Sequence, residues 1–158
     1  MKIYIACDHG GFELKEDIVK FLKSKHDVED LGPKDYDPTD DYPDYALKVA
    51  KRVASDKNSL GILICRSGNG MVITANKVKG SYAALCFTPE HAEKARNHDN
   101  ANILVLPADY LNCCGGNCNC KKHLEIVKSF ISSTFAGSNT RHGRRFSKVL
   151  TIEGENLK

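Results

Sequence analysis

The chain has 158 residues, a formal net charge of +3 and a sequence pI of about 8.4. The length fits one domain, so we treat residues 1–158 as a single domain. The charge is too small for a typical nucleic-acid binder, and no apolar run approaches the length of a membrane span. We therefore expect neither nucleic acid nor membrane as a partner.

The cysteines indicate the compartment. There are seven of them, an odd number, and several lie within apolar runs. The apolar run after Met1 is too short for a signal peptide, and charged residues soon follow it. These features favour a reduced, cytoplasmic protein over a disulfide-stabilised one.

Short runs and amphipathic segments alternate along the chain. Five runs, most of them near-continuously apolar, predict strands buried on both faces of a parallel sheet: 2–7, 27–32, 60–65, 82–87 and 102–106. Segments with helical periodicity separate or follow them: 11–25, 42–55, 88–95 and 123–135. The alternation predicts an α/β fold, a three-layer αβα sandwich with a five-stranded parallel, Rossmann-like sheet.

A glycine-rich turn, CRSGNG, follows the third run at residues 65–70. Open parallel sheets bind ligands beyond the carboxyl ends of their strands. The glycines and a helix that begins near Asn69 would expose backbone N–H groups to a phosphate or a developing oxyanion. We expect these groups to lower the pKa of Cys65, so that it acts as a base. This segment is equally consistent with a packed cysteine before an ordinary turn.

A second polar cluster, Asp8 and His9, follows the first run. Taken alone, Asp8 is expected to cap the next helix and His9 to lie on the surface. Beside a cysteine from a neighbouring strand, the two residues would instead form a site for sugar hydroxyls.

Two further groups lie elsewhere in the predicted fold. His98 and Asp99 precede the fifth run, at the amino edge of the sheet, whereas Cys65 lies at the carboxyl edge. If both serve one site, two subunits must build it, which predicts a homodimer and leaves a tetramer open as an alternative. Arg141 and Arg145 are four residues apart, so on a helix they would share a face and could bind one phosphate. Basic clusters of this kind are, however, usually solvated surface.

Five motifs together resemble ribose-5-phosphate isomerase type B, in the sugar-phosphate isomerase family that includes the galactose-6-phosphate isomerase subunits. They are CDHGGFELK, DYPDYA, GILICRSGNGMVITANK, HDNANIL and RHGRR, and they extend nearly from end to end. The resemblance implies a cofactor-free, metal-free aldose–ketose isomerase. It would interconvert ribose 5-phosphate and ribulose 5-phosphate through a cis-enediolate.

The resemblance also implies residue roles. Cys65 would move the proton between C1 and C2, Ser67 would assist at the sugar oxygens, and His98 would open the furanose ring. The backbone of residues 66–70 would form the anion hole. The implied substrate-binding residues are Asp8, His9, Tyr42, Arg66, Gly68, Asn69, Gly70, Asp99, Arg141 and Arg145.

Three residues depart from the family's pattern. Arg66 stands where glycine is usual, Asp99 where asparagine is usual, and Asp109 where an arginine is usual. Our hypothesis is that Arg66 replaces the lost arginine as a phosphate contact. Two alternatives stay open, an isomerase of a hexose 6-phosphate and a non-catalytic phosphosugar-binding or thiol-sensing module. Loss of Cys65 would inactivate an isomerase but not a binding module.

A cysteine-rich insertion covers residues from about 109 to 120. Its cysteines, Cys113, Cys114, Cys118 and Cys120, lack the paired Cys-x-x-Cys spacing of structural zinc sites. We therefore predict an exposed loop that binds no metal.

Overall fold

The computed structural model describes residues 1–111 and 121–157. Its centre is a sheet of five parallel strands in the order β2-β1-β3-β5-β4. The strands are β1 (Lys2–Cys7), β2 (Asp27–Asp30), β3 (Ser59–Cys65), β4 (Ala83–Leu85) and β5 (Ile103–Pro107). The parallel sheet predicted from the apolar runs is confirmed, and the polar run 27–32 contributes one edge strand, β2, which ends at Asp30.

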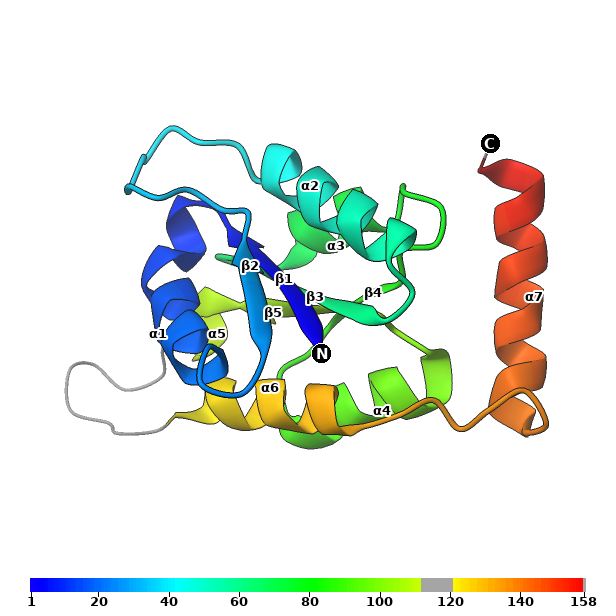
Figure 1. Cartoon of the computed structure of the whole chain (residues 1–158). Coiled ribbons are helices and arrows are strands. Elements are labelled where there is room, and N and C mark those ends of the chain that lie inside the picture. The colour runs from blue at the N-terminus through cyan, green and yellow to red at the C-terminus, as the bar shows by residue number, and fades with distance from the viewer. Residues whose placement is uncertain (112–120, 158) are drawn as a thin grey trace.

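Helices cover both faces of the sheet, which gives the predicted three layers (Figure 1). One face carries α2 (Tyr42–Ser55) and α3 (Asn69–Ala75). The other carries α1 (Phe12–Leu22), α4 (Pro89–Asp99), α5 (Ala108–Leu111) and α6 (Lys122–Ser132). Thr88 caps α4: its side chain accepts a hydrogen bond from the backbone N–H of His91.

The central strand β3 shows how the sheet positions the site. All seven of its residues are buried, and successive side chains point to opposite faces. Ile62 and Ile64 pack against the layer of α1 and α6, whereas Leu63 and Cys65 pack against α2 and α3. Cys65 is therefore the last residue of β3, at the carboxyl edge of the sheet, and its side chain faces the layer of α2 and α3.

The carboxyl ends of neighbouring strands meet at this edge. Cys7 of β1 pairs with Ile64 of β3, and Cys65 pairs with Pro107 of β5. The backbone N–H of Asp8 donates to the carbonyl of Ile64 over 3.3 Å. The turns that follow β1, β3 and β5 consequently lie side by side.

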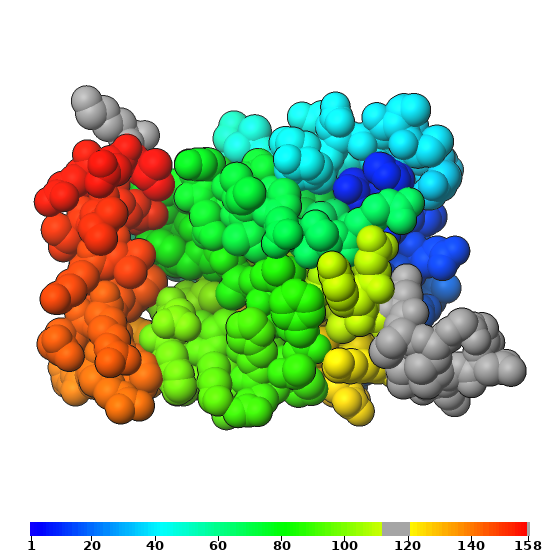
Figure 2. Space-filling model, turned by 180° about the vertical axis from the view of Figure 1, so that it is seen from behind, coloured from blue at the N-terminus to red at the C-terminus, as the bar shows by residue number. Residues whose placement is uncertain are grey.

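The longest helix, α7 (Arg141–Asn156), is a feature that the sequence did not predict beyond a basic cluster at its start. It forms a column at one end of the molecule (Figures 1 and 2). Glu153 fastens it to the body, because its carboxylate accepts hydrogen bonds from the Gly80 N–H and the Tyr82 hydroxyl. Only Gly143 of this helix is fully buried, while Val149 and Ile152 are largely exposed.

The helices of residues 1–111 and 121–157 include none that is both long enough and apolar enough to span a membrane.

Candidate active site

The turn after β3 holds Cys65 in a network of backbone donors. Gly68 has a φ of 80°, in the left-handed region that side chains other than glycine rarely adopt. This conformation turns the Gly68 N–H toward Cys65, where it donates to Sγ over 3.2 Å. Helix α3 then begins at Asn69, as predicted.

The expectation of a lowered pKa for Cys65 is wrong. Burial raises the pKa of this thiol, and the charge of Asp8 raises it further, although hydrogen bonds from the Gly68, Met71 and Ser67 backbones act in the opposite direction. The side chain is 5% exposed, so the cost of burying a charged sulfur outweighs the donors. The resting residue is a protonated thiol whose thiolate, once formed, would have several N–H partners.

Tyr42 and Ser67 flank this turn. The ring of Tyr42, the first residue of α2, lies directly over Gly70, where a Cβ atom would stand 2.6 Å from two ring carbons. Glycine is therefore needed at position 70 for the ring to approach the turn. Ser67 Oγ accepts a weak hydrogen bond from the Asn69 N–H over 3.4 Å.

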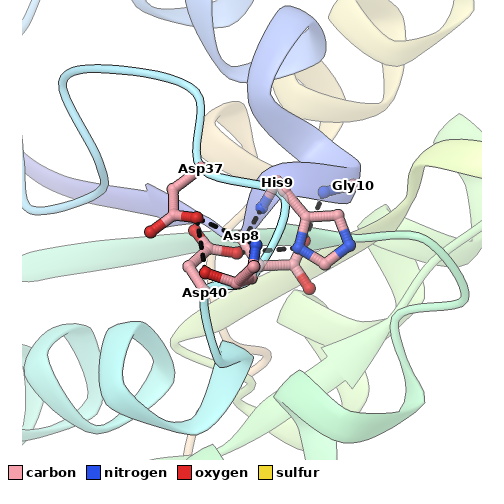
Figure 3. A network of polar contacts seen from close by, with 6 residues as sticks. Asp8, His9, Gly10, Asp37 and Asp40 are labelled. Carbon is pink, nitrogen blue, oxygen red and sulfur yellow. Dashed lines mark hydrogen bonds and ion pairs between the residues drawn. The ribbon is translucent and has the colours of Figure 1, made fainter.

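The turn after β1 is a network of carboxylates around His9 (Figure 3). Asp8 caps the short 3-10 turn His9–Gly11, accepting from the Gly10 N–H over 2.9 Å, as the simpler interpretation predicted. Burial raises the pKa of Asp8. His9 is not a free surface residue, because its Nδ1 lies 2.8 Å from Oδ1 of Asp40.

A cleft of about 410 Å³ opens between the first turn and Arg66; its lining residues are His9, Gly10, Phe12, Glu13, Leu14, Tyr36 and Arg66. The guanidinium of Arg66 lies 3.6 Å from Asp109, and both side chains are at least half exposed. Asp109 is also tied to this turn through its N–H, which donates to the Arg66 carbonyl over 3.0 Å. Two of the three departures from the family's pattern are thus joined as one ion pair.

A second group of predicted residues lies at the amino edge of the sheet. His98, in the last turn of α4, stacks on His142 of α7 with ring centroids 4.0 Å apart and planes 11° apart. Partial desolvation, followed by the charges of His98 and Arg141, lowers the pKa of His142. A groove of about 460 Å³ runs between α7 and the body here and includes His98, Asp99 and Arg145 in its walls.

The predicted residues therefore form two groups in one chain. The first comprises Asp8, His9, Tyr42 and residues 65–70 at the carboxyl edge. The second comprises His98, Asp99, Arg141 and Arg145 at the amino edge, with both arginines in the first turns of α7. This is the separation that the sequence predicted.

Sequence reasoning gave no role to two polar residues of these groups. Asp40 holds His9, and His142 stacks on His98. Asp40 lies just before the DYPDYA motif and His142 lies within RHGRR, but no spacing rule links either to its partner.

Within the part of the chain that the structure describes, no group of three or more His, Cys, Asp or Glu side chains could hold a metal ion. The insertion predicted as a loop from about residue 109 begins instead within helix α5, which extends to Leu111, and its cysteines Cys113, Cys114, Cys118 and Cys120 fall outside the described residues.

A thiol at the end of a buried central strand, ringed by backbone donors and bordered by a histidine–carboxylate pair, defines a parallel α/β protein with a candidate site for acid–base chemistry. Residues 3–149 match the Ribose/Galactose Isomerase family. The chain belongs to this family.

Individual relatives agree. The probable ribose-5-phosphate isomerase B of Mycoplasma pneumoniae is 43% identical over 154 residues, which cover 97% of this chain and 95% of the relative. The ribose-5-phosphate isomerase B of Mycolicibacterium paratuberculosis is 39% identical, with 97% and 92% covered. A crystal structure of the Mycoplasma genitalium ribose-5-phosphate isomerase B, with bound ribulose-5-phosphate, superposes with a TM-score of 0.88 at 42% identity, covering 98% of this chain and 97% of the other. By this kinship the chain is an enzyme, an aldose–ketose isomerase.

Proposed function

We propose that the chain interconverts ribose 5-phosphate and ribulose 5-phosphate, with Cys65 as the base. The observation that carries the proposal is the position of Cys65, at the carboxyl end of the central strand with the Gly68 N–H on its sulfur. The M. genitalium relative, with ribulose-5-phosphate bound, supports a pentose phosphate as the substrate.

The proposed reaction is a proton transfer between neighbouring carbons. The Cys65 thiolate removes the C2 proton of the open-chain aldose, and the electron pair of that C–H bond forms a C1–C2 double bond, which leaves an enediolate with its negative charge on O1. The C2 hydroxyl then passes its proton to O1, the thiol returns its proton to C1, and C2 becomes the ketone carbonyl. A base with a high pKa is strong once deprotonated, which favours removal of a weakly acidic C–H proton. Ser67 and the backbone of residues 66–70 would stabilise the oxyanion.

The second group of residues supports a homodimer. His98, the proposed ring-opening acid, lies at the opposite edge of the sheet from Cys65, so a site that uses both needs a second copy of the chain. The groove beside α7 has apolar walls that include Phe146, Val149 and Ile152, and such surface is typical of an interface. We propose that this face of α7 packs against a second copy.

Substrate anchors would then come from both copies. His9, Arg66 and Tyr42 of one copy would face the sugar from the carboxyl edge, while Asp99, Arg141 and Arg145 would approach from the other. Two arginines one helical turn apart are suited to a phosphate dianion. We also propose a cytoplasmic location, which the free thiols Cys7, Cys65 and Cys86 support.

A coupled assay tests the function. Wild type and Cys65→Ala are compared on ribose 5-phosphate and on allose and galactose 6-phosphates. We expect turnover of the pentose phosphate that Cys65→Ala abolishes. Preference for a hexose phosphate would change the assigned substrate, and equal activity of the two proteins would refute Cys65 as the base. A wild type that binds these sugars without turnover would favour a binding module.

A further inference from the structure

Asp40 is a buried acid to which the proposed mechanism gives no role. Its side chain is only 6% exposed, and Oδ1 lies 2.9 Å from the His9 backbone nitrogen and 2.8 Å from His9 Nδ1. Burial and the neighbouring Asp40 carboxylate together raise the pKa of Tyr45 to about 12, which places that phenol next to the same acid. Burying a carboxylate is costly unless hydrogen bonds compensate it; Oδ1 receives both contacts from His9, whereas the buried Oδ2 has no hydrogen-bond partner among the described residues.

The hydrogen bonds to Asp40 assign the ring proton to Nδ1 when that carboxylate is ionised. The His9 backbone N–H donates to Oδ1, and an ionised carboxylate can only accept hydrogen bonds. The Nδ1 atom, 2.8 Å from the same oxygen, must therefore be the donor. In the neutral ring this leaves Nε2 as an acceptor, the nitrogen farther from Asp40 (Figure 3).

Hydrogen bonds within the loop before α2 hold Asp40 so that its side chain points toward His9. Asp37 Oδ1 accepts hydrogen bonds from the Thr39 backbone over 2.9 Å and from its hydroxyl over 2.7 Å. The N–H of Asp40 then donates to the Asp37 carbonyl over 3.3 Å. Asp40 thus reaches His9 from 31 residues away along the chain, and His9 lines the cleft that Arg66 borders.

We propose that Asp40 is a positioning residue that fixes the tautomer and orientation of His9, so that Nε2 faces the cleft as an acceptor for a substrate hydroxyl. This assignment rests on the proposed function for the identity of the substrate. The tautomer of the His9 ring in the free protein does not depend on the proposed function. An acceptor at Nε2 suits a sugar O–H group, whereas a phosphate oxygen would require a donor there.

Nitrogen-15 NMR of the histidine rings tests the tautomer directly. The protein is measured under mildly alkaline conditions, where imidazoles are neutral, and His9→Ala identifies the His9 signals. We expect the Nδ1–H tautomer in wild type and in Asp35→Ala, which changes an exposed acid of the same loop. Asp40→Ala should release the ring into a mixture dominated by the Nε2–H form. An Nε2–H ring in wild type, or an unchanged ring in Asp40→Ala, would overturn the proposal.

Kinetics separate positioning from mere support of the fold. Asp40→Ala should lower kcat/KM by about 10- to 100-fold, close to the loss caused by His9→Ala. Because Asp40 acts through the His9 ring, adding Asp40→Ala to His9→Ala should lower kcat/KM by no more than about a further twofold. Additive losses would refute the proposal.

Asp40→Asn keeps an acceptor oxygen and provides a second test of the proposal in case Asp40→Ala does not fold. It should retain the tautomer and most of the activity, and loss of activity with the tautomer intact would also contradict us. If wild type lacks pentose isomerase activity but its ring shows the Nδ1–H form, the proposed function fails while the role of Asp40 in fixing the ring stands.

Discussion

The titration of Cys65 follows from its burial. Burial raises the pKa of this thiol above its ordinary value of 9.0, so at pH 7 the thiolate fraction is at most about 1%. Forming the base at pH 7 therefore costs about 3 kcal/mol or more. Each unit of pH below the pKa changes the thiolate fraction about tenfold, so kcat/KM for ribose 5-phosphate should rise about tenfold between pH 7 and pH 8.

Two measurements check this titration. The ultraviolet absorbance of thiolates, followed against pH as the difference between wild type and Cys65→Ala, isolates this one group because the other cysteines cancel. The pH profile of kcat/KM reports the same group in the free enzyme. A midpoint below pH 8 in the absorbance, or a rate already constant from pH 6.5, would refute the reasoning from burial.

Two other predictions concern the Arg66–Asp109 pair and the remaining buried thiols. Arg66→Gly should raise KM for the sugar phosphate, and Asp109→Asn, which frees Arg66 from a partner 3.6 Å away, should lower it; an unchanged KM in Arg66→Gly would exclude Arg66 as an anchor. Burial raises the pKa values of Cys7 and Cys86 to about 12, so their contribution to stability is present below about pH 9 and declines as pH rises toward 12. In that range each thiol should lower the free energy of unfolding by about 1 kcal/mol per pH unit. A melting series in which Cys86→Ala and wild type lose stability equally steeply with rising pH would contradict this.

The fold could be predicted largely from periodicity. The apolar runs at 2–7 and 60–65 can be buried only within a sheet covered on both faces, and the helix at 42–55 has the bounds expected from its apolar stripe. Helix α7 was missed although its sequence is amphipathic: Phe146 packs on Tyr82 and Phe135, whereas Val149 and Ile152 stay exposed in the single chain. In the proposed dimer a second copy would cover these residues, and a single sequence gives no direct sign of such a contact.

The site was predictable in its position but not in its electrostatics. The alternation of elements predicts a parallel sheet whose turns share one edge, and the structure adds the pairing of β1 with β3 that places Asp8 beside Cys65. The thiol's pKa depends on how far burial outweighs the N–H donors, which a glycine-rich turn does not reveal. The contact between Asp40 and His9 joins residues 31 positions apart through a loop, and no local pattern encodes it.

The central claim is that Cys65 of one copy and His98 of another build each active site. Cys65→Ala and His98→Ala proteins, each with little activity, are mixed, dissociated and reassociated. In a symmetric dimer, half of the random pairs are hybrids, and each hybrid has one site with both native residues. The account predicts recovery of about one quarter of wild-type activity, and activity that stays at the mean of the two separate proteins would contradict it.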